Sequence, residues 1–101
     1  MQLSSGDAKS PLMQERLEAL RKKFIAGIPQ RLDDMAAAPS PVARLQVLHK
    51  LIGAALSYKA QALGELARSI EAALESGVDT NWPACLAALH VEFRKLEAGD
   101  E

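Results

Sequence analysis

Apolar residues recur at three- or four-residue steps along most of this chain, and polar residues fill the positions between them. This spacing places apolar side chains on one face of a helix and is typical of amphipathic α-helices that pack together. Four segments follow this pattern, and their apolar stripes are Leu17, Leu20, Phe24, Ile28, Leu32 and Met35; Leu45, Leu48, Leu51, Ile52, Ala55 and Leu56; Leu63, Leu66, Ala67, Ile70 and Leu74; and Trp82, Leu86, Leu89, Phe93 and Leu96. No segment has the strict alternation of a half-buried β-strand. The pattern therefore predicts an all-α protein.

Serine followed by proline marks the start of two of these helices, at residues 10–11 and 40–41. The serine hydroxyl can cap the first turn, and proline at the first helical position loses no N–H that the helix needs. Asn81 or Thr80 is the corresponding cap of the last helix. Gly77 follows the third stripe and fits the left-handed position just past a helix end.

Two places make the helix boundaries harder to predict. Pro29 lies within the first stripe, and it cannot donate to the carbonyl four residues back, so we expect either a kink or two shorter helices end to end. The segment SYKAQ, between the second and third stripes, contains neither glycine nor proline, so one helix could run over residues 41–76. A tight turn around residues 57–60 gives a more compact protein, and we favour it.

Length and composition agree with a small helical domain. A chain of 101 residues suits one domain, and 49% hydrophobic residues with only 4% aromatics favour helices packed through alanine and leucine. We therefore expect an up-down antiparallel helical bundle of four or five helices, with a four-helix core, over residues 10–99. Residues 1–9 are small, polar and unpatterned, and we interpret them as a flexible tail.

Charge and cysteine content exclude several classes of function. Twelve basic and thirteen acidic residues give a formal net charge of −1, which attracts neither nucleic acid nor an anionic membrane strongly. The first ten residues lack the features of a secretory signal, and no apolar stretch approaches the roughly 20 residues that span a bilayer. The single cysteine, Cys85, is interpreted as a buried thiol, and it leaves no thiolate cluster for zinc. We expect a cytoplasmic protein with no metal site.

His49 is the main candidate for chemistry. At about 100° per residue it falls roughly 90–100° from the centre of its stripe, at the boundary of the core. Helical side chains lean toward the N-terminus, so residue 53 would cover His49, and Gly53 leaves the imidazole uncovered at a cost of about 1 kcal/mol relative to alanine. Two interpretations remain open. Either the histidine must be approached by another protein, or Gly53 admits a neighbouring helix and His49 is an ordinary polar residue.

The remaining titratable groups form no convincing site. His90 has no adjacent glycine and no surrounding motif, and we interpret it as a solvated boundary residue. Asp33 and Asp34 point about 100° apart on a helix and cannot converge on one substrate. The basic run at residues 21–23 is interpreted as a solvated face that could help to hold an acidic partner.

Residues 49–71, HKLIGAALSYKAQALGELARSIE, resemble the signature of histidine-containing phosphotransfer (HPt) domains of bacterial two-component phosphorelays. That signature has a histidine, an apolar residue two positions later, a glycine four positions later, and a following helix that ends in Leu-Glu or similar. The matching positions here are His49, Leu51, Gly53, Leu63, Ala67, Arg68, Ile70 and Glu71. The first helix, LEALRKKFIAGIPQRLDDM, also resembles the family's opening helix with its proline, so the resemblance covers residues 11–98.

The resemblance implies that His49 accepts a phosphoryl group from a receiver-domain phospho-aspartate and passes it to another response regulator. Its partners would be receiver domains or a hybrid sensor kinase, with Mg²⁺ held by the receiver and no cofactor, kinase or hydrolase activity of its own. We expect a monomer. An exposed imidazole is mostly neutral at pH 7, which leaves a ring nitrogen free to attack. The face that docks the partner would consist of Leu45, Gln46, Lys50, Ile52, Gly53 and Leu56.

Three positions depart from the family pattern. Ile52 stands where many members have a lysine, Leu56 where a glycine is common, and Lys59 where a turn glycine is common. These departures leave two alternatives open: an HPt-like interaction module that binds a signalling partner without carrying phosphate, and a helical chaperone or assembly factor.

Overall fold

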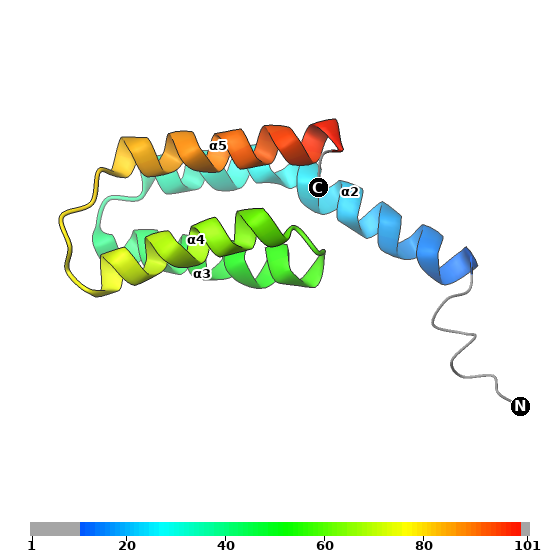
Figure 1. Cartoon of the computed structure of the whole chain (residues 1–101), viewed down its shortest axis with the longest axis horizontal. Coiled ribbons are helices and arrows are strands. Elements are labelled where there is room, and N and C mark those ends of the chain that lie inside the picture. Colours follow the sequence, from blue (N-terminus) through cyan, green and yellow to red (C-terminus); the bar gives the residue numbers. More distant parts are fainter. Residues whose placement is uncertain (1–10, 100–101) are drawn as a thin grey trace, which may run out of the picture.

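A computed structural model describes residues 11–99 of the chain. They form four α-helices (Figure 1), which are α2 (Pro11–Ala37), α3 (Pro41–Ser57), α4 (Gln61–Glu75) and α5 (Trp82–Ala98). The predicted all-α fold with four helices is confirmed. The predicted tail over residues 1–9 and the predicted cap at Ser10 lie outside the described residues.

The four helices enclose one apolar core. α3 packs mainly on α4 and α2 on α5, and contacts of α2 with α3 and of α4 with α5 complete the bundle. The core residues are Phe24, Ile28, Leu32, Met35, Leu48, Leu51, Ile52, Ala55, Ala60, Leu63, Ala67, Ile70, Trp82, Leu89, Phe93 and Leu96. Cys85 is only half-buried and packs against this core, so the prediction of a buried thiol holds in part.

Most helix ends follow from the sequence signals. The Ser40 hydroxyl accepts a hydrogen bond from the Ala43 N–H at 3.2 Å, and the Asn81 side chain caps α5 in the same way. Gly77 has a φ of 78°, the left-handed conformation predicted for it. α2 runs through Pro29 without a break, so the alternative of two separate helices is wrong.

The predicted tight turn between α3 and α4 is confirmed, and contacts with α2 hold it in place. α3 ends at Ser57, α4 begins at Gln61, and Lys59 in the turn has a φ of 61°. The Tyr58 ring stacks on Phe24 with ring centroids 5.3 Å apart, and the Arg21 Nε donates to the Tyr58 carbonyl oxygen at 2.9 Å. The turn is therefore fixed by aromatic and hydrogen-bond contacts instead of by a glycine.

The first part of α2 extends beyond the bundle. Leu17 is 52% exposed and Leu20 is 41% exposed, so this part of the predicted apolar stripe does not reach the core. The cause is length: α2 has 27 residues, whereas the helices around it have 15 to 17. In Figure 1 the first turns of α2 slope away from the other helices, and its later turns run alongside α5.

Candidate functional site: an exposed histidine between α3 and α4

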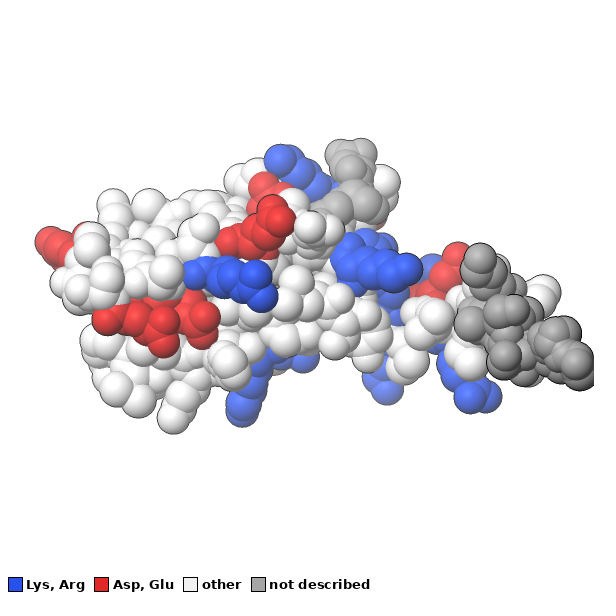
Figure 2. Space-filling view, turned by 60° about the horizontal axis from the view of Figure 1, so that its bottom comes forward, with Lys and Arg blue, Asp and Glu red and all other residues white. Residues whose placement is uncertain are grey.

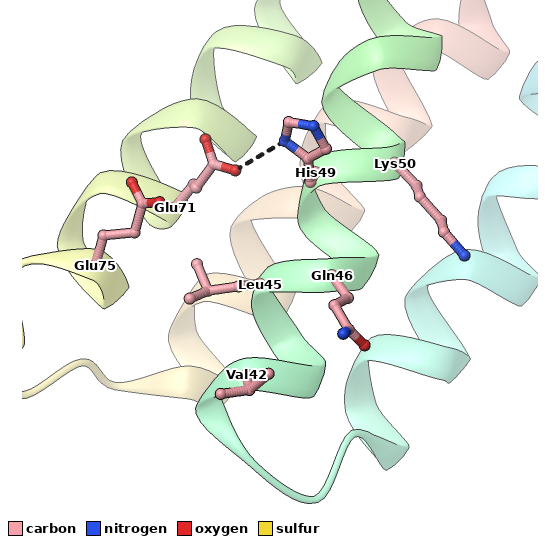
Figure 3. Close-up of a pocket in the computed structure, with 7 residues that line it drawn as sticks. All are labelled: Val42, Leu45, Gln46, His49, Lys50, Glu71 and Glu75. Carbon is pink, nitrogen blue, oxygen red and sulfur yellow. Dashed lines mark hydrogen bonds and ion pairs between the residues drawn. The ribbon is translucent and has the colours of Figure 1, made fainter.

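His49 projects from the middle of α3 toward α4 and into solvent. Its side chain is 82% exposed, and its Nδ1 atom lies 3.3 Å from Oε2 of Glu71 on α4 (Figure 3). An ionised carboxylate only accepts hydrogen bonds, so Nδ1 carries the proton and donates a hydrogen bond to Glu71. In the neutral ring the other nitrogen, Nε2, then holds the free lone pair, and it points away from Glu71.

Gly53, one helical turn after His49, faces open space. A Cβ atom built on Gly53 would meet no neighbouring residue within 4 Å, so the prediction that Gly53 could admit a neighbouring helix is wrong, while the role of His49 stays a prediction. Gly64 on α4, in contrast, lies within the contact between α3 and α4. A Cβ atom at Gly64 would lie 3.4 Å from the Ala55 Cβ and 3.4 Å from the Leu56 Cδ2.

His49 lies at the edge of a groove between α3 and α4. The residues that line this groove are Val42, Leu45, Gln46, His49, Lys50, Glu71 and Glu75. Three of the residues predicted for the docking face, Leu45, Gln46 and Lys50, are thus brought together with the histidine (Figure 3). We term this surface the His49 groove.

The other predicted docking residues lie elsewhere. Ile52 is 7% exposed and belongs to the core, so its assignment to an accessible docking face is wrong. The reason is its place in the apolar stripe of α3, directly after the fully buried Leu51. Leu56 is 46% exposed but lies against Gly64 of α4, outside the His49 groove. Gly53 is exposed one turn beyond the histidine.

The charge of the His49 groove is mainly acidic. Two carboxylates, Glu71 and Glu75, line it, together with one cation, Lys50. Figure 3 shows that the Lys50 side chain extends away from the imidazole ring. The position that carries a lysine in many HPt domains is the buried Ile52, so the lining of the groove places no cation next to the ring.

Glu71 lies within the segment that resembles the HPt signature, but its hydrogen bond to His49 was not predicted from the sequence. The position of Glu75 in the groove was not predicted either. A signal for Glu71 exists in the spacing around the turn. His49 lies ten residues before Lys59 and Glu71 lies twelve residues after it, so a helical hairpin with a tight turn at Lys59 brings them to the same level. Glu75 follows one helical turn later on the same face of α4.

The remaining candidates stay separate from this site. His90 is exposed on α5, and Asp34 accepts a hydrogen bond from Gln30 at 3.0 Å on α2. Arg21 differs from the prediction of a solvated side chain, because it bonds to the Tyr58 carbonyl. Among residues 11–99, no group of three or more His, Cys, Asp or Glu side chains could hold a metal ion. None of the helices in the described part of the chain combines the length and apolar character needed to cross a membrane.

No protein-family model, curated protein or solved structure matches this chain. Its function is therefore argued from the geometry around His49 and from the resemblance of residues 49–71 to the HPt signature.

Proposed function

We propose that this protein is a phosphorelay intermediate in which His49 accepts a phosphoryl group from the phospho-aspartate of a receiver domain and passes it to another response regulator. The observation that carries the proposal is the exposure of the imidazole, 82%, with Nδ1 bonded to Glu71 and open space at Gly53. An incoming phosphoryl group can therefore reach Nε2 without displacing any side chain at position 53. A receiver domain is a fitting donor, because it brings the Mg²⁺ and the charged groups that phosphoryl transfer needs.

The transfer step follows from the protonation of the ring. The Nε2 lone pair attacks the phosphorus atom, an N–P bond forms, and the bond from phosphorus to the aspartate oxygen breaks. The bonding electrons leave with that oxygen, which restores the aspartate carboxylate. The phosphorylated ring keeps its Nδ1 proton and becomes positively charged, so the Glu71 carboxylate at 3.3 Å stabilises the product. In the onward transfer, a carboxylate oxygen of the next receiver's aspartate attacks the phosphorus atom, a P–O bond forms, the N–P bond breaks and its electrons return to Nε2.

This proposal assigns partners and location as well. The donor and acceptor are receiver domains, with or without a hybrid sensor kinase, and docking uses the His49 groove with Leu45 as its partly buried apolar contact. The protein acts in the cytoplasm as a monomer, has no kinase or hydrolase activity of its own, and binds neither nucleic acid nor membrane.

A second candidate function is an interaction module that binds a signalling partner without carrying phosphate. The acidic lining of the His49 groove favours it, because Glu71 and Glu75 repel an anionic phosphoryl group. Ile52 supplies no compensating cation, and Lys50 extends away from the ring. Under this function, docking would depend on the groove but not on the nucleophilicity of the imidazole.

Radiolabelled phosphoryl transfer distinguishes the two functions. A receiver domain phosphorylated with ³²P is incubated with the wild-type chain, with His49→Gln and with the matched control His90→Gln. We expect an acid-labile, base-stable label on the wild type and on His90→Gln, and none on His49→Gln. Binding of receiver domains without any label would favour the interaction module. A label that persists on His49→Gln would show that the acceptor has been assigned wrongly.

A further inference from the structure

A second surface of the molecule carries exposed apolar residues in a regular arrangement. Leu17 and Leu20, 52% and 41% exposed, lie on the first part of α2. They continue the same helical stripe as Phe24 and Ile28, which are buried in the core. The stripe thus changes from buried to exposed along a single helix, at the point where α2 leaves the bundle.

The exposed part of this stripe borders a groove. Its walls are α2, through Leu17, Glu18 and Arg21, and the turn after α3, through Ser57, Tyr58 and Lys59. The hydrogen bond from Arg21 to the Tyr58 carbonyl joins the two walls. We term this surface the α2 groove. It shares no lining residue with the His49 groove, and Ser57 is eight residues from His49, which is about 12 Å along a helix.

Cations flank the apolar stripe on both sides. With 100° per residue, Arg16 and Arg21 lie roughly 70° to either side of the centre of the stripe, and Lys23 lies roughly 90° from it. The carboxylates Glu15 and Glu18 lie farther round, roughly 130–170° from the centre, although Glu18 also lines the α2 groove beside Arg21. In Figure 2, several Lys and Arg side chains and a smaller group of Asp and Glu side chains occur along the right-hand part of the molecule, toward which α2 extends.

We propose that the α2 groove binds an amphipathic helix of a partner protein in which an apolar stripe is flanked by aspartate and glutamate. The leucines supply the apolar contact, as in other complexes in which a helix binds in a groove. Arg21 and Lys59 in the groove, with Arg16 and Lys23 beside it on α2, supply positive charge that complements the carboxylates of the partner. Because this surface excludes His49, binding there is independent of phosphotransfer, and it provides a second contact for tethering a partner.

Other occupants match the surface less well. A second copy of α2 would place Arg16 and Arg21 near their own equivalents, and like charges repel. The ten residues that precede α2 contain one carboxylate, Asp7, and one lysine, so they offer little charge complementarity. A bilayer surface is flat on this scale and cannot enter the groove between α2 and the turn at Tyr58.

Binding of synthetic helical peptides tests the proposal. The probe is a fluorescein-labelled peptide of 18 residues with leucine at three- and four-residue spacing and glutamate between, and the control peptide has lysine in place of each glutamate. We expect the glutamate peptide to bind at least about tenfold more tightly than the lysine peptide, and less tightly as salt is added. The double variant Leu17→Ser/Leu20→Ser should lose at least about tenfold in affinity. Val91→Ser, which changes a 51% exposed valine on α5, should bind like the wild type.

Charge reversal gives a second readout that does not depend on removing apolar residues. Arg16→Glu/Lys23→Glu should weaken binding of the glutamate peptide and strengthen binding of the lysine peptide, and far-ultraviolet circular dichroism checks that each variant is folded. The proposal is overturned if both peptides bind equally, if neither binds, or if the leucine double variant binds like the wild type. A dimer in sedimentation that the leucine double variant abolishes would identify a second copy as the occupant. Binding to phosphatidylglycerol vesicles without peptide binding would identify a lipid surface.

Discussion

Two glycines in neighbouring helices, Gly53 in α3 and Gly64 in α4, have opposite surroundings. Gly64 is buried, and a Cβ atom there would lie 3.4 Å from Ala55 and from Leu56, an ordinary contact distance, so the contact between α3 and α4 has room for a methyl group but not for a long side chain. Gly53 is exposed, and a Cβ atom there would meet nothing within 4 Å. A glycine within a helix costs about 1 kcal/mol relative to alanine. At Gly64 the neighbouring helix limits the size of the side chain, whereas at Gly53 no neighbour does, and this open position lies one turn after His49.

The same substitution at both glycines provides the largest test of this comparison. Gly64→Gln places a long polar side chain between α3 and α4, and we expect it to lower the free energy of unfolding by about 2–4 kcal/mol through overpacking and burial of an amide. Gly64→Ala is the matched control and should stay within about 1 kcal/mol of the wild type, because 3.4 Å is an ordinary contact distance. Urea denaturation measures both. A Gly64→Gln protein as stable as the wild type would show that the close packing at Gly64 is unimportant.

Gly53→Gln should have the reverse effect on stability and a separate effect on function. We expect the free energy of unfolding to rise by about 0.5–1 kcal/mol, because glutamine is a better helix former and meets no neighbour there. The side chain covers the imidazole, so the rate at which His49 accepts phosphate from a receiver domain should fall about tenfold, an increase of roughly 1.4 kcal/mol in the barrier. Urea denaturation and a time course of labelling measure the two effects. Labelling at the wild-type rate would contradict the role of the open space.

The hydrogen bond from His49 to Glu71 can be weakened without altering the open space at Gly53. Glu71→Gln keeps an acceptor for the Nδ1 proton but removes the negative charge that stabilises the phosphorylated ring. An exposed charge pair contributes about 0.3–1 kcal/mol, so phosphate acceptance should slow about two- to fivefold. Glu75→Gln is the matched control, since Glu75 lines the same groove without an observed bond to the ring. Equal rates in the two variants would contradict the role assigned to Glu71.

Lys59 extends the comparison to a position where glycine is absent although the backbone favours it. Its φ of 61° lies in the left-handed region, which is strained for lysine and free of strain for glycine. Lys59→Gly relieves this strain but makes the unfolded chain more flexible, so we expect a small net gain in stability, about 0.5 kcal/mol. Thermal unfolding measures it, with the exposed Lys50→Gly as a control that should lose stability. A loss at both positions would show that side-chain contacts of Lys59 outweigh the strain.

Much of the fold is predictable because local signals determine it. The apolar spacing, the Ser40 and Asn81 caps and Gly77 define where the helices lie, and each acts over only a few residues. The exposure of Leu17 and Leu20, in contrast, cannot be predicted from such local signals. Their spacing is the same as that of Phe24, and only the length of the neighbouring helices decides that they remain exposed.

Local signals in the sequence likewise predict one part of the candidate site and not the other. The exposure of His49 agrees with its predicted place at the boundary of the apolar stripe, which helix periodicity is enough to predict. The hydrogen bond from His49 to Glu71 depends on how α4 folds back along α3. The turn at Lys59 sets this register, and no glycine in the sequence marks the position of the turn. Ile52 belongs to the apolar stripe of α3, so its burial could be predicted from the sequence even though it was assigned to the docking face.

The central claim is that Nε2 of His49 is the nucleophile, with Nδ1 protonated and bonded to Glu71. Nuclear magnetic resonance of ¹⁵N-labelled protein, recorded before and after phosphorylation by a receiver domain, tests it most directly. Long-range ¹H–¹⁵N correlations distinguish the two ring nitrogens of His49. We predict that the phosphoryl group appears on Nε2 and that Nδ1 remains protonated. A phosphoryl group on Nδ1, or ring nitrogens of His49 that stay unchanged while another residue is labelled, would contradict the account.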